Sequence, residues 1–146
     1  MADKLTEFDP ELQEILKKKA SSLKKDASFF NEVNRKGVTH VDDSNIDKIV
    51  QSSPLPVLVD FSADAWCKPC QVMAPVYEEL SKEYANKILF LKINTDHNPQ
   101  ASGRYRIFSV PTFIMFNSGN RLAQRAGAAP KAKFKAWIEE ILAKNA

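Results

Sequence analysis

The chain has 146 residues, of which 44% are hydrophobic and 27% charged, and its formal net charge is +3. This length suffices for about one domain with its own core, and the small, mixed charge argues against a nucleic-acid-binding protein. No stretch has the roughly 20 apolar residues that a membrane span needs. The N-terminus lacks the apolar segment of a secretory signal, and its early acids are unlike a transit peptide. We therefore expect a cytoplasmic protein without membrane contact; a secreted form whose signal has been removed is the alternative.

Residues 1–36 differ from the rest of the chain. The pair Asp9–Pro10 is typical of a helix start, and apolar residues then recur at helical spacing as far as Leu23. The sequence predicts an N-terminal helical extension over 1–36 and a separate domain over 37–146. The extension is expected to be a solvated arm, a helix docked on its own domain, or a contact for a second copy or a partner. We expect the protein to be a monomer.

From residue 38 onward, strand and helix patterns alternate. Strands are predicted over 38–41, 55–61, 88–93, 112–116 and 121–125, and helices around 46–50 and over 67–84, 98–105 and 130–144. The run over 55–61 is almost continuously apolar, which is typical of a strand buried on both faces. A strong turn at 117–120 predicts that the last two strands form a hairpin. The sequence therefore indicates an α/β fold with a mixed sheet covered by helices on both faces.

Asp60 lies within this apolar strand, where an ionised carboxylate is costly unless it is paired. One interpretation is a buried carboxyl group with a raised pKa, which exchanges protons with a nearby thiol. The other is an ordinary strand-end aspartate that reaches solvent or caps the next helix.

The only two cysteines, Cys67 and Cys70, follow this strand at the start of the predicted helix. A disulfide that encloses so short a loop adds little stability, so chemistry explains the pair better than structure does. The positive end of the helix dipole lowers the pKa of a thiol placed there and favours the thiolate, which attacks disulfides. A second thiol one turn later can resolve the mixed disulfide, and Pro69 between them restricts the loop. The pair therefore predicts dithiol–disulfide exchange.

A metal site is the main alternative for the cysteines. With the distant His40 and His97 they do not make a closed four-ligand zinc site, although a site shared across a dimer and an inert buried pair stay open. We expect no metal and no bound cofactor, because the two thiols themselves carry the electrons.

Pro111 directly precedes a predicted core strand, a position that suits a residue without an N–H group. A cis bond before it would expose backbone groups of Val110 to an incoming peptide strand.

Several motifs together resemble the thioredoxin family. They are VDFSADAWCKPC, LKINTD, YRIFSVPTFIMF, NSGN and RAGAAPKAKFKAWI, which follow one another over about residues 38–144. The resemblance implies a thioredoxin fold with a central five-stranded mixed sheet flanked by helices. It also implies reduction of disulfides in client proteins, with a thioredoxin reductase-type electron donor and without nucleic acid or membrane partners. A disulfide oxidase or isomerase, and a scaffold module that binds through its N-terminal helix, are the alternatives.

The resemblance assigns roles to individual residues. It implies that Cys67 attacks the substrate disulfide and that Cys70 resolves the mixed disulfide. Asp60 corresponds to a buried proton-transferring aspartate, and Lys92 to a lysine near that carboxylate, although an ordinary strand-edge lysine is the alternative. The implied substrate-binding residues lie around the pair; they are Trp66, Lys68, Pro69, Val110, Pro111 (as a cis-proline) and Gly127.

The chain departs from the family pattern in three places. Ser62 stands where an aromatic residue is common, and one extra residue lies within 62–65, so the loop before Trp66 is expected to bulge. Lys68 replaces the usual glycine between the cysteines. A cation there favours the thiolate, and hence the reduced form, so it is expected to make the couple slightly more oxidising.

Overall fold

The structure is a computed structural model and describes residues 37–145. Its elements are β1 (Thr39–Val41), α3 (Ile46–Ser52), β2 (Val57–Ser62), α4 (Lys68–Glu83), β3 (Leu89–Asn94), the 3-10 helix η1 (Thr95–His97), α5 (Pro99–Arg104), β4 (Thr112–Asn117), β5 (Asn120–Ala126) and α6 (Lys131–Lys144). Each strand and helix predicted from residue 38 onward is present, with bounds shifted by one or two residues, and η1 is additional. The helix predicted within 1–36 lies outside the described residues.

The five strands form one mixed sheet in the order β1-β3-β2-β4-β5. β1, β3 and β2 are parallel, whereas β4 runs antiparallel to both β2 and β5. The predicted hairpin joins β4 to β5 through Ser118 and Gly119, both with positive φ. The prediction of a mixed five-stranded sheet is confirmed.

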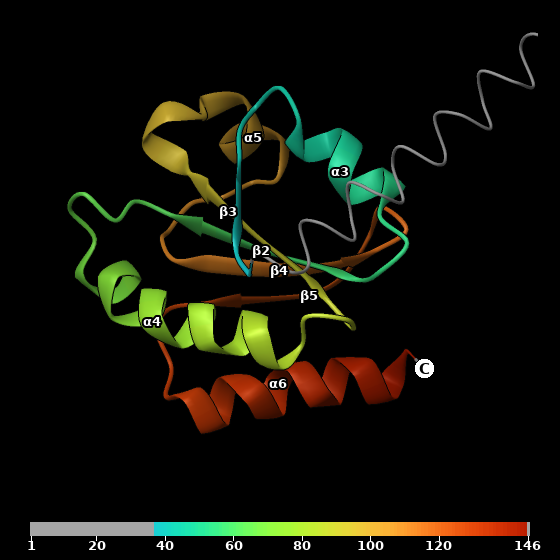
Figure 1. The fold of residues 1–146 in the computed structure, drawn as a ribbon. Coiled ribbons are helices and arrows are strands. Elements are labelled where there is room, and N and C mark those ends of the chain that lie inside the picture. The colour runs from blue at the N-terminus through green and yellow to red at the C-terminus, as the bar shows by residue number, and fades with distance from the viewer. Residues whose placement is uncertain (1–36, 146) are drawn as a thin grey trace, which may run out of the picture.

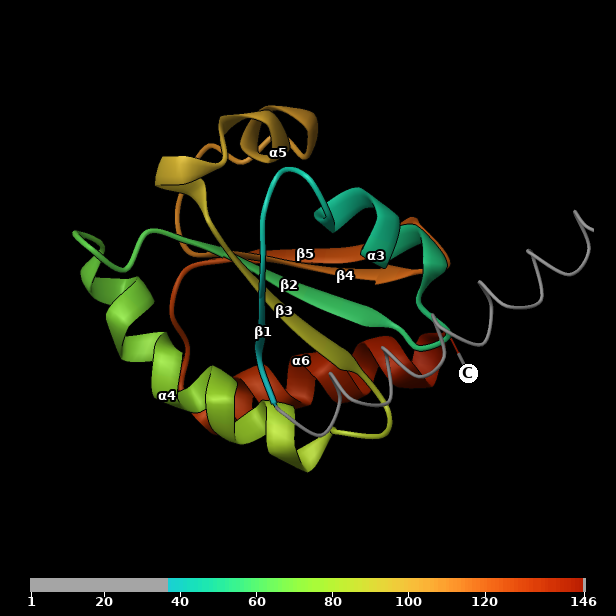
Figure 2. The same cartoon turned by 45° about the horizontal axis from the view of Figure 1, so that its top comes forward.

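Helices cover both faces of this sheet. Figures 1 and 2 show α4 and α6 together on one face and α3 and α5 on the other. α4 turns its buried side chains toward the sheet at helical spacing, and they are Cys70, Met73, Tyr77, Leu80 and Ser81. α6 adds Phe134, Ile138 and Ile141 to the same core. Within the described residues, no helix combines the length and apolar character needed to cross a lipid bilayer.

Strand register places a row of charged side chains on the α4 side of the sheet. Asp60 of β2 pairs with Lys92 of β3 and with Phe113 of β4, and Phe113 pairs with Arg125 of β5. Residues paired across a sheet project from the same face. Phe113 contacts Tyr77 of α4, with ring centroids 5.7 Å apart, which identifies that face. Asp60 and Lys92 therefore project beneath α4, close to its N-terminal end.

Candidate active site

A tight turn connects β2 to α4. The carbonyl oxygen of Ala63 accepts hydrogen bonds from the N–H groups of Trp66 (3.2 Å) and Cys67 (2.9 Å). The side-chain amide of Gln71 in α4 donates to the carbonyl oxygen of Asp64 at 2.7 Å. The extra residue noted in the sequence is thus accommodated in a hydrogen-bonded turn, whose two ends are fixed to β2 and α4.

Cys67 and Cys70 form a disulfide at the start of α4, with Cα atoms 5.2 Å apart. Cys67 is the N-cap residue, and its Sγ accepts a hydrogen bond from the N–H group of Cys70 at 3.2 Å. Pro69 lies between them in the first helical turn, and Lys68 is exposed there. Cys67 is 4% exposed and Cys70 1%. After reduction, a negative charge on Cys67 would lie where the helix dipole and a backbone N–H stabilise it.

The loop before β4 lies against the disulfide. The carbonyl oxygen of Val110 is 3.7 Å from the Sγ of Cys67, and the Val110–Pro111 peptide bond is cis, as the resemblance implies. The N–H group of Gly127 donates to the carbonyl oxygen of Pro111 at 2.8 Å. Gly127 has a φ of +89°, a conformation that other residues rarely adopt. Val110, Pro111 and Gly127 therefore lie side by side, with the Val110 carbonyl next to the Cys67 sulfur.

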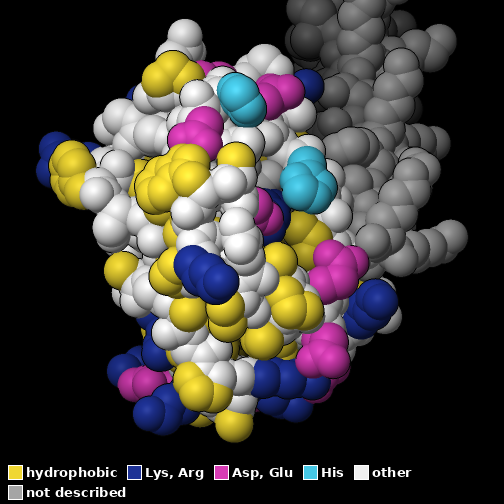
Figure 3. Space-filling model, turned by 90° about the vertical axis from the view of Figure 1, so that its left-hand side faces the viewer, with side chains coloured by type: hydrophobic (Ala, Val, Ile, Leu, Met, Phe, Trp, Pro, Cys, Tyr) yellow, Lys and Arg dark blue, Asp and Glu magenta, His cyan; other side chains and the backbone are white. Residues whose placement is uncertain are grey.

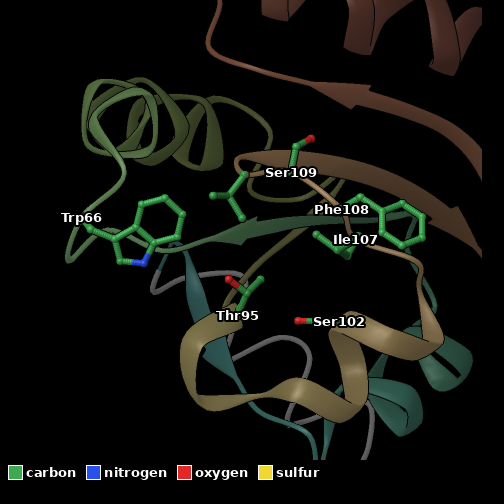
Figure 4. Close-up of a pocket in the computed structure, with 7 residues that line it drawn as sticks. Trp66, Thr95, Ser102, Ile107, Phe108 and Ser109 are labelled. Carbon is green, nitrogen blue, oxygen red and sulfur yellow. The ribbon is translucent and has the colours of Figure 1, made fainter.

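Trp66 forms one wall of a shallow pocket beside the cysteines. Its side chain is 65% exposed, and its indole N–H lies 3.0–3.1 Å from both carboxylate oxygens of Asp96. The pocket has a volume of about 270 Å³ and is lined by Trp66, Thr95, Ser102, Ile107, Phe108, Ser109 and Val110. Figure 4 shows Trp66 on one side of it and Phe108 on the other. Phe108 is 91% exposed. The sequence analysis did not single out Asp96 or Phe108.

Asp60 is buried, with 1% of its surface exposed. Neither carboxylate oxygen has a hydrogen-bond partner among the described residues. Burial raises the pKa of Asp60 to about 7; the charge of Lys92 opposes this rise and that of Asp64 adds to it. The alternative of a solvent-reaching or helix-capping aspartate does not agree with this environment. A carboxyl group with this pKa changes its protonation state near neutral pH.

Lys92 lies between two carboxylates. Its Nζ donates a hydrogen bond to Oδ2 of Asp64 at 2.6 Å and lies 4.0 Å from Oδ2 of Asp60. The side chain is only 11% exposed, unlike an ordinary strand-edge lysine. The sequence analysis placed Lys92 near Asp60 but did not identify Asp64 as its closer partner.

The described residues contain no group of three or more histidine, cysteine, aspartate or glutamate side chains placed to hold a metal ion. The chemistry that this site offers is that of the cysteine pair at the N-terminus of α4, with a buried carboxyl group on β2, the strand that leads into this helix. Fold and site together define a thiol–disulfide oxidoreductase.

Comparison with known proteins identifies the family to which the chain belongs. The thioredoxin family model matches residues 37–140. The chain is 42% identical over 102 residues to thioredoxin of Synechocystis sp., an alignment that covers 70% of this chain and 94% of that protein. It is 45% identical over 102 residues to the chloroplastic M-type thioredoxin of Pisum sativum, covering 70% of this chain and 59% of that protein. The chain belongs to the thioredoxin family.

The predicted thioredoxin fold and the predicted dithiol–disulfide exchange are thereby confirmed. Thioredoxins are protein-disulfide oxidoreductases that act on disulfide-containing substrates and are re-reduced by a reductase. The chain spans about three fifths of the length of the chloroplastic relatives from Pisum sativum and Spinacia oleracea.

The predicted cytoplasmic location is contradicted by these relatives. Similar proteins from Pisum sativum, Spinacia oleracea, Oryza sativa and Chlamydomonas reinhardtii are all named as chloroplastic. The prediction depended on acidic residues near the N-terminus, which lie in 1–36 and thus before the part of the chain that the family model matches. Acidic residues in that segment therefore do not exclude a plastid protein.

Proposed function

We propose that this protein reduces disulfides in client proteins, with Cys67 as the attacking thiolate and Cys70 as the resolving thiol. The position of the Cys67 sulfur carries this proposal. It lies at the N-cap of α4 and accepts a hydrogen bond from a backbone N–H group, and Cys67 as a residue is 4% exposed against 1% for Cys70. These features favour Cys67 both as the ionised thiol and as the one that a client disulfide reaches first.

The exchange then proceeds in two steps. The thiolate of Cys67 attacks one sulfur of the client disulfide, and the other client sulfur leaves as a thiolate and takes up a proton. Asp60, as a carboxylate, accepts the proton of Cys70, whose thiolate attacks the Cys67 sulfur in the mixed disulfide. The second client sulfur leaves, so the client gains two electrons and the Cys67–Cys70 disulfide forms. The two thiols carry these electrons, and no bound cofactor takes part.

The client segment is proposed to bind across Trp66, Val110, Pro111 and Gly127. Figure 3 shows hydrophobic side chains gathered on the face of the molecule that carries this end of α4. Exposed apolar groups of this kind are typical of protein-binding surfaces. Phe108, on the far side of the pocket from Trp66, extends the surface. The backbone of Val110, beside the Cys67 sulfur, is placed to pair with an extended client strand.

Residues 37–146 are proposed as the catalytic domain, in agreement with the family match over 37–140, and 1–36 as an extension outside it. The chloroplastic relatives support a plastid location. The electron donor is then a thioredoxin reductase or a ferredoxin-thioredoxin reductase.

Reduction of insulin by dithiothreitol tests this function. The wild-type protein is expected to accelerate the reaction, and the double variant Cys67→Ser, Cys70→Ser is expected not to. Equal rates for the two proteins would favour the alternative that the chain is a scaffold module without redox activity.

The redox potential of the pair, measured against a glutathione buffer, then separates a reductase from an oxidase or isomerase, whose pair would be more oxidising.

Lys68 is expected to make the couple slightly more oxidising, because its charge stabilises the neighbouring thiolate. Lys68→Gln should shift the redox potential in the reducing direction by at most about 30 mV, which is roughly 1.4 kcal/mol for a two-electron couple. The effect is small because the side chain is exposed and solvent screens its charge. Lys68→Arg keeps the charge and should leave the potential in place. Equal potentials for the wild type and Lys68→Gln would exclude this contribution.

A further inference from the structure

The ammonium group of Lys92 makes its closest charged contact with Asp64, although Asp60 lies opposite it in the sheet. Asp60 and Lys92 are register partners on β2 and β3, so their side chains leave the same face next to each other. The Nζ of Lys92 is nevertheless 4.0 Å from Asp60 and 2.6 Å from Asp64. Asp60 is left without a hydrogen-bond partner among the described residues. The lysine thus pairs with the carboxylate that lies outside the sheet.

The turn before α4 holds Asp64 in this position. Its backbone is fixed by the two hydrogen bonds to Ala63 and by Gln71, which donates to the Asp64 carbonyl. The turn also contains the extra residue that distinguishes this chain from the family pattern. The Asp64 side chain is 43% exposed, although its Oδ1 is buried and has no hydrogen-bond partner among the described residues. Because the Asp64 side chain is partly exposed, its pair with Lys92 has a lower desolvation cost than a pair between Lys92 and the buried Asp60.

We propose that Asp64 is a positioning residue for the exchange reaction: it holds the ammonium of Lys92 away from Asp60, so that the Asp60 carboxylate keeps a high affinity for the proton that it takes from Cys70. This role rests on the proposed function of Asp60 as the group that accepts the proton of Cys70. Asp64 touches neither the sulfurs nor the client, and acts through Lys92 and through its own negative charge.

Other charged and titratable groups lie on the elements packed around Asp60. α4 carries the buried Cys70 and Tyr77, and the charge of Asp60 adds to the burial that raises the pKa of Tyr77. Arg125 of β5 lies beyond Phe113 in the row, and His40 of β1 lies beyond Lys92. Of these groups, Lys92 and Asp64 are the two whose charges act on the pKa of Asp60, in opposite directions. Removing the Asp64 carboxylate ends a repulsion and frees the lysine, and both changes favour ionised Asp60.

The test is a titration of Asp60 in the oxidised protein, followed by carbon NMR of labelled aspartate side chains. Asp64→Asn should lower the midpoint by about one pH unit, in the range expected when a cation approaches a carboxylate closely. Asp64→Glu keeps the carboxylate and should have a midpoint close to that of the wild type. Glu140→Gln removes the carboxylate of the Lys144 ion pair on α6 and serves as the matched control, with no change expected. An unchanged midpoint in Asp64→Asn, and in Asp64→Ser as a second variant, overturns the proposal.

A double-mutant cycle tests the route through the lysine. In a Lys92→Met background, Asp64→Asn should lower the Asp60 midpoint by less than it does in the wild type, because only the direct repulsion is left to remove. An equal shift in both backgrounds overturns the positioning role. These titrations do not require activity, so their failure is distinct from failure of the insulin assay. With activity intact, the acid limb of the pH–rate profile should move with the midpoint.

Discussion

Cys67→Ser is expected to reduce insulin reduction to the background rate of dithiothreitol and to form no adduct with a client. Cys70→Ser should also lose turnover, yet accumulate a stable mixed disulfide between Cys67 and the client. We expect the difference from their positions: Cys67 is the helix N-cap and is 4% exposed, whereas Cys70 is 1% exposed. We therefore expect an incoming disulfide to meet Cys67 first.

Non-reducing electrophoresis with a disulfide-containing client separates the two variants, and dithiothreitol should release the trapped client. Alkylation of the reduced variants at neutral pH provides a second measurement. The single thiol of Cys70→Ser should react faster than a cysteine in an unstructured peptide, and that of Cys67→Ser more slowly. If an adduct forms on Cys67→Ser and not on Cys70→Ser, then Cys70 is the attacking cysteine and Cys67 the resolving one.

The order of the elements and the position of the cysteine pair could be predicted from the sequence because both depend on local patterns. The apolar run that became β2, the helix periodicity after Cys67 and the turn before β5 each determine their own segment. The apolar neighbours of Asp60 indicated burial as one of two interpretations, the other being an aspartate that reaches solvent or caps a helix. These features need no knowledge of which strands are paired.

The partners of the site residues could not be predicted in this way, because they depend on how distant segments meet. Asp64 was visible only as part of a one-residue insertion, and its ion pair with Lys92 depends on the turn that follows β2. Asp96 contacts the Trp66 indole across 30 residues of sequence. The exposure of Phe108 follows from the path of the loop between α5 and β4, in which the residue pattern indicates no regular structure. Single charged or aromatic residues in loops carry no periodic signal.

Asp60→Asn is expected to stabilise the oxidised protein progressively, relative to the wild type, as the pH rises from about 4 to 7. The folded wild type binds a proton at Asp60 up to a pKa of about 7, whereas the unfolded chain releases it near the ordinary value of 3.8. Between these values the folded state holds more protons, so the stability that protonated Asp60 contributes is lost as the pH rises. The loss is roughly 1.4 kcal/mol per pH unit and about 4 kcal/mol in all.

Urea unfolding of both proteins at half-unit steps from pH 4 to 9 measures this difference, with the disulfide intact throughout. The ordinary carboxylates contribute with the opposite sign: interactions with Lys131 and Lys135 lower the pKa of Glu83, so its stabilisation is lost as the pH falls. Such groups are common to both proteins and cancel in the comparison. The free energy of unfolding of Glu140→Gln should run parallel to that of the wild type at every pH. If the stability of Asp60→Asn also runs parallel to that of the wild type, the Asp60 carboxyl group titrates at its ordinary pKa. Another base would then have to accept the proton of Cys70.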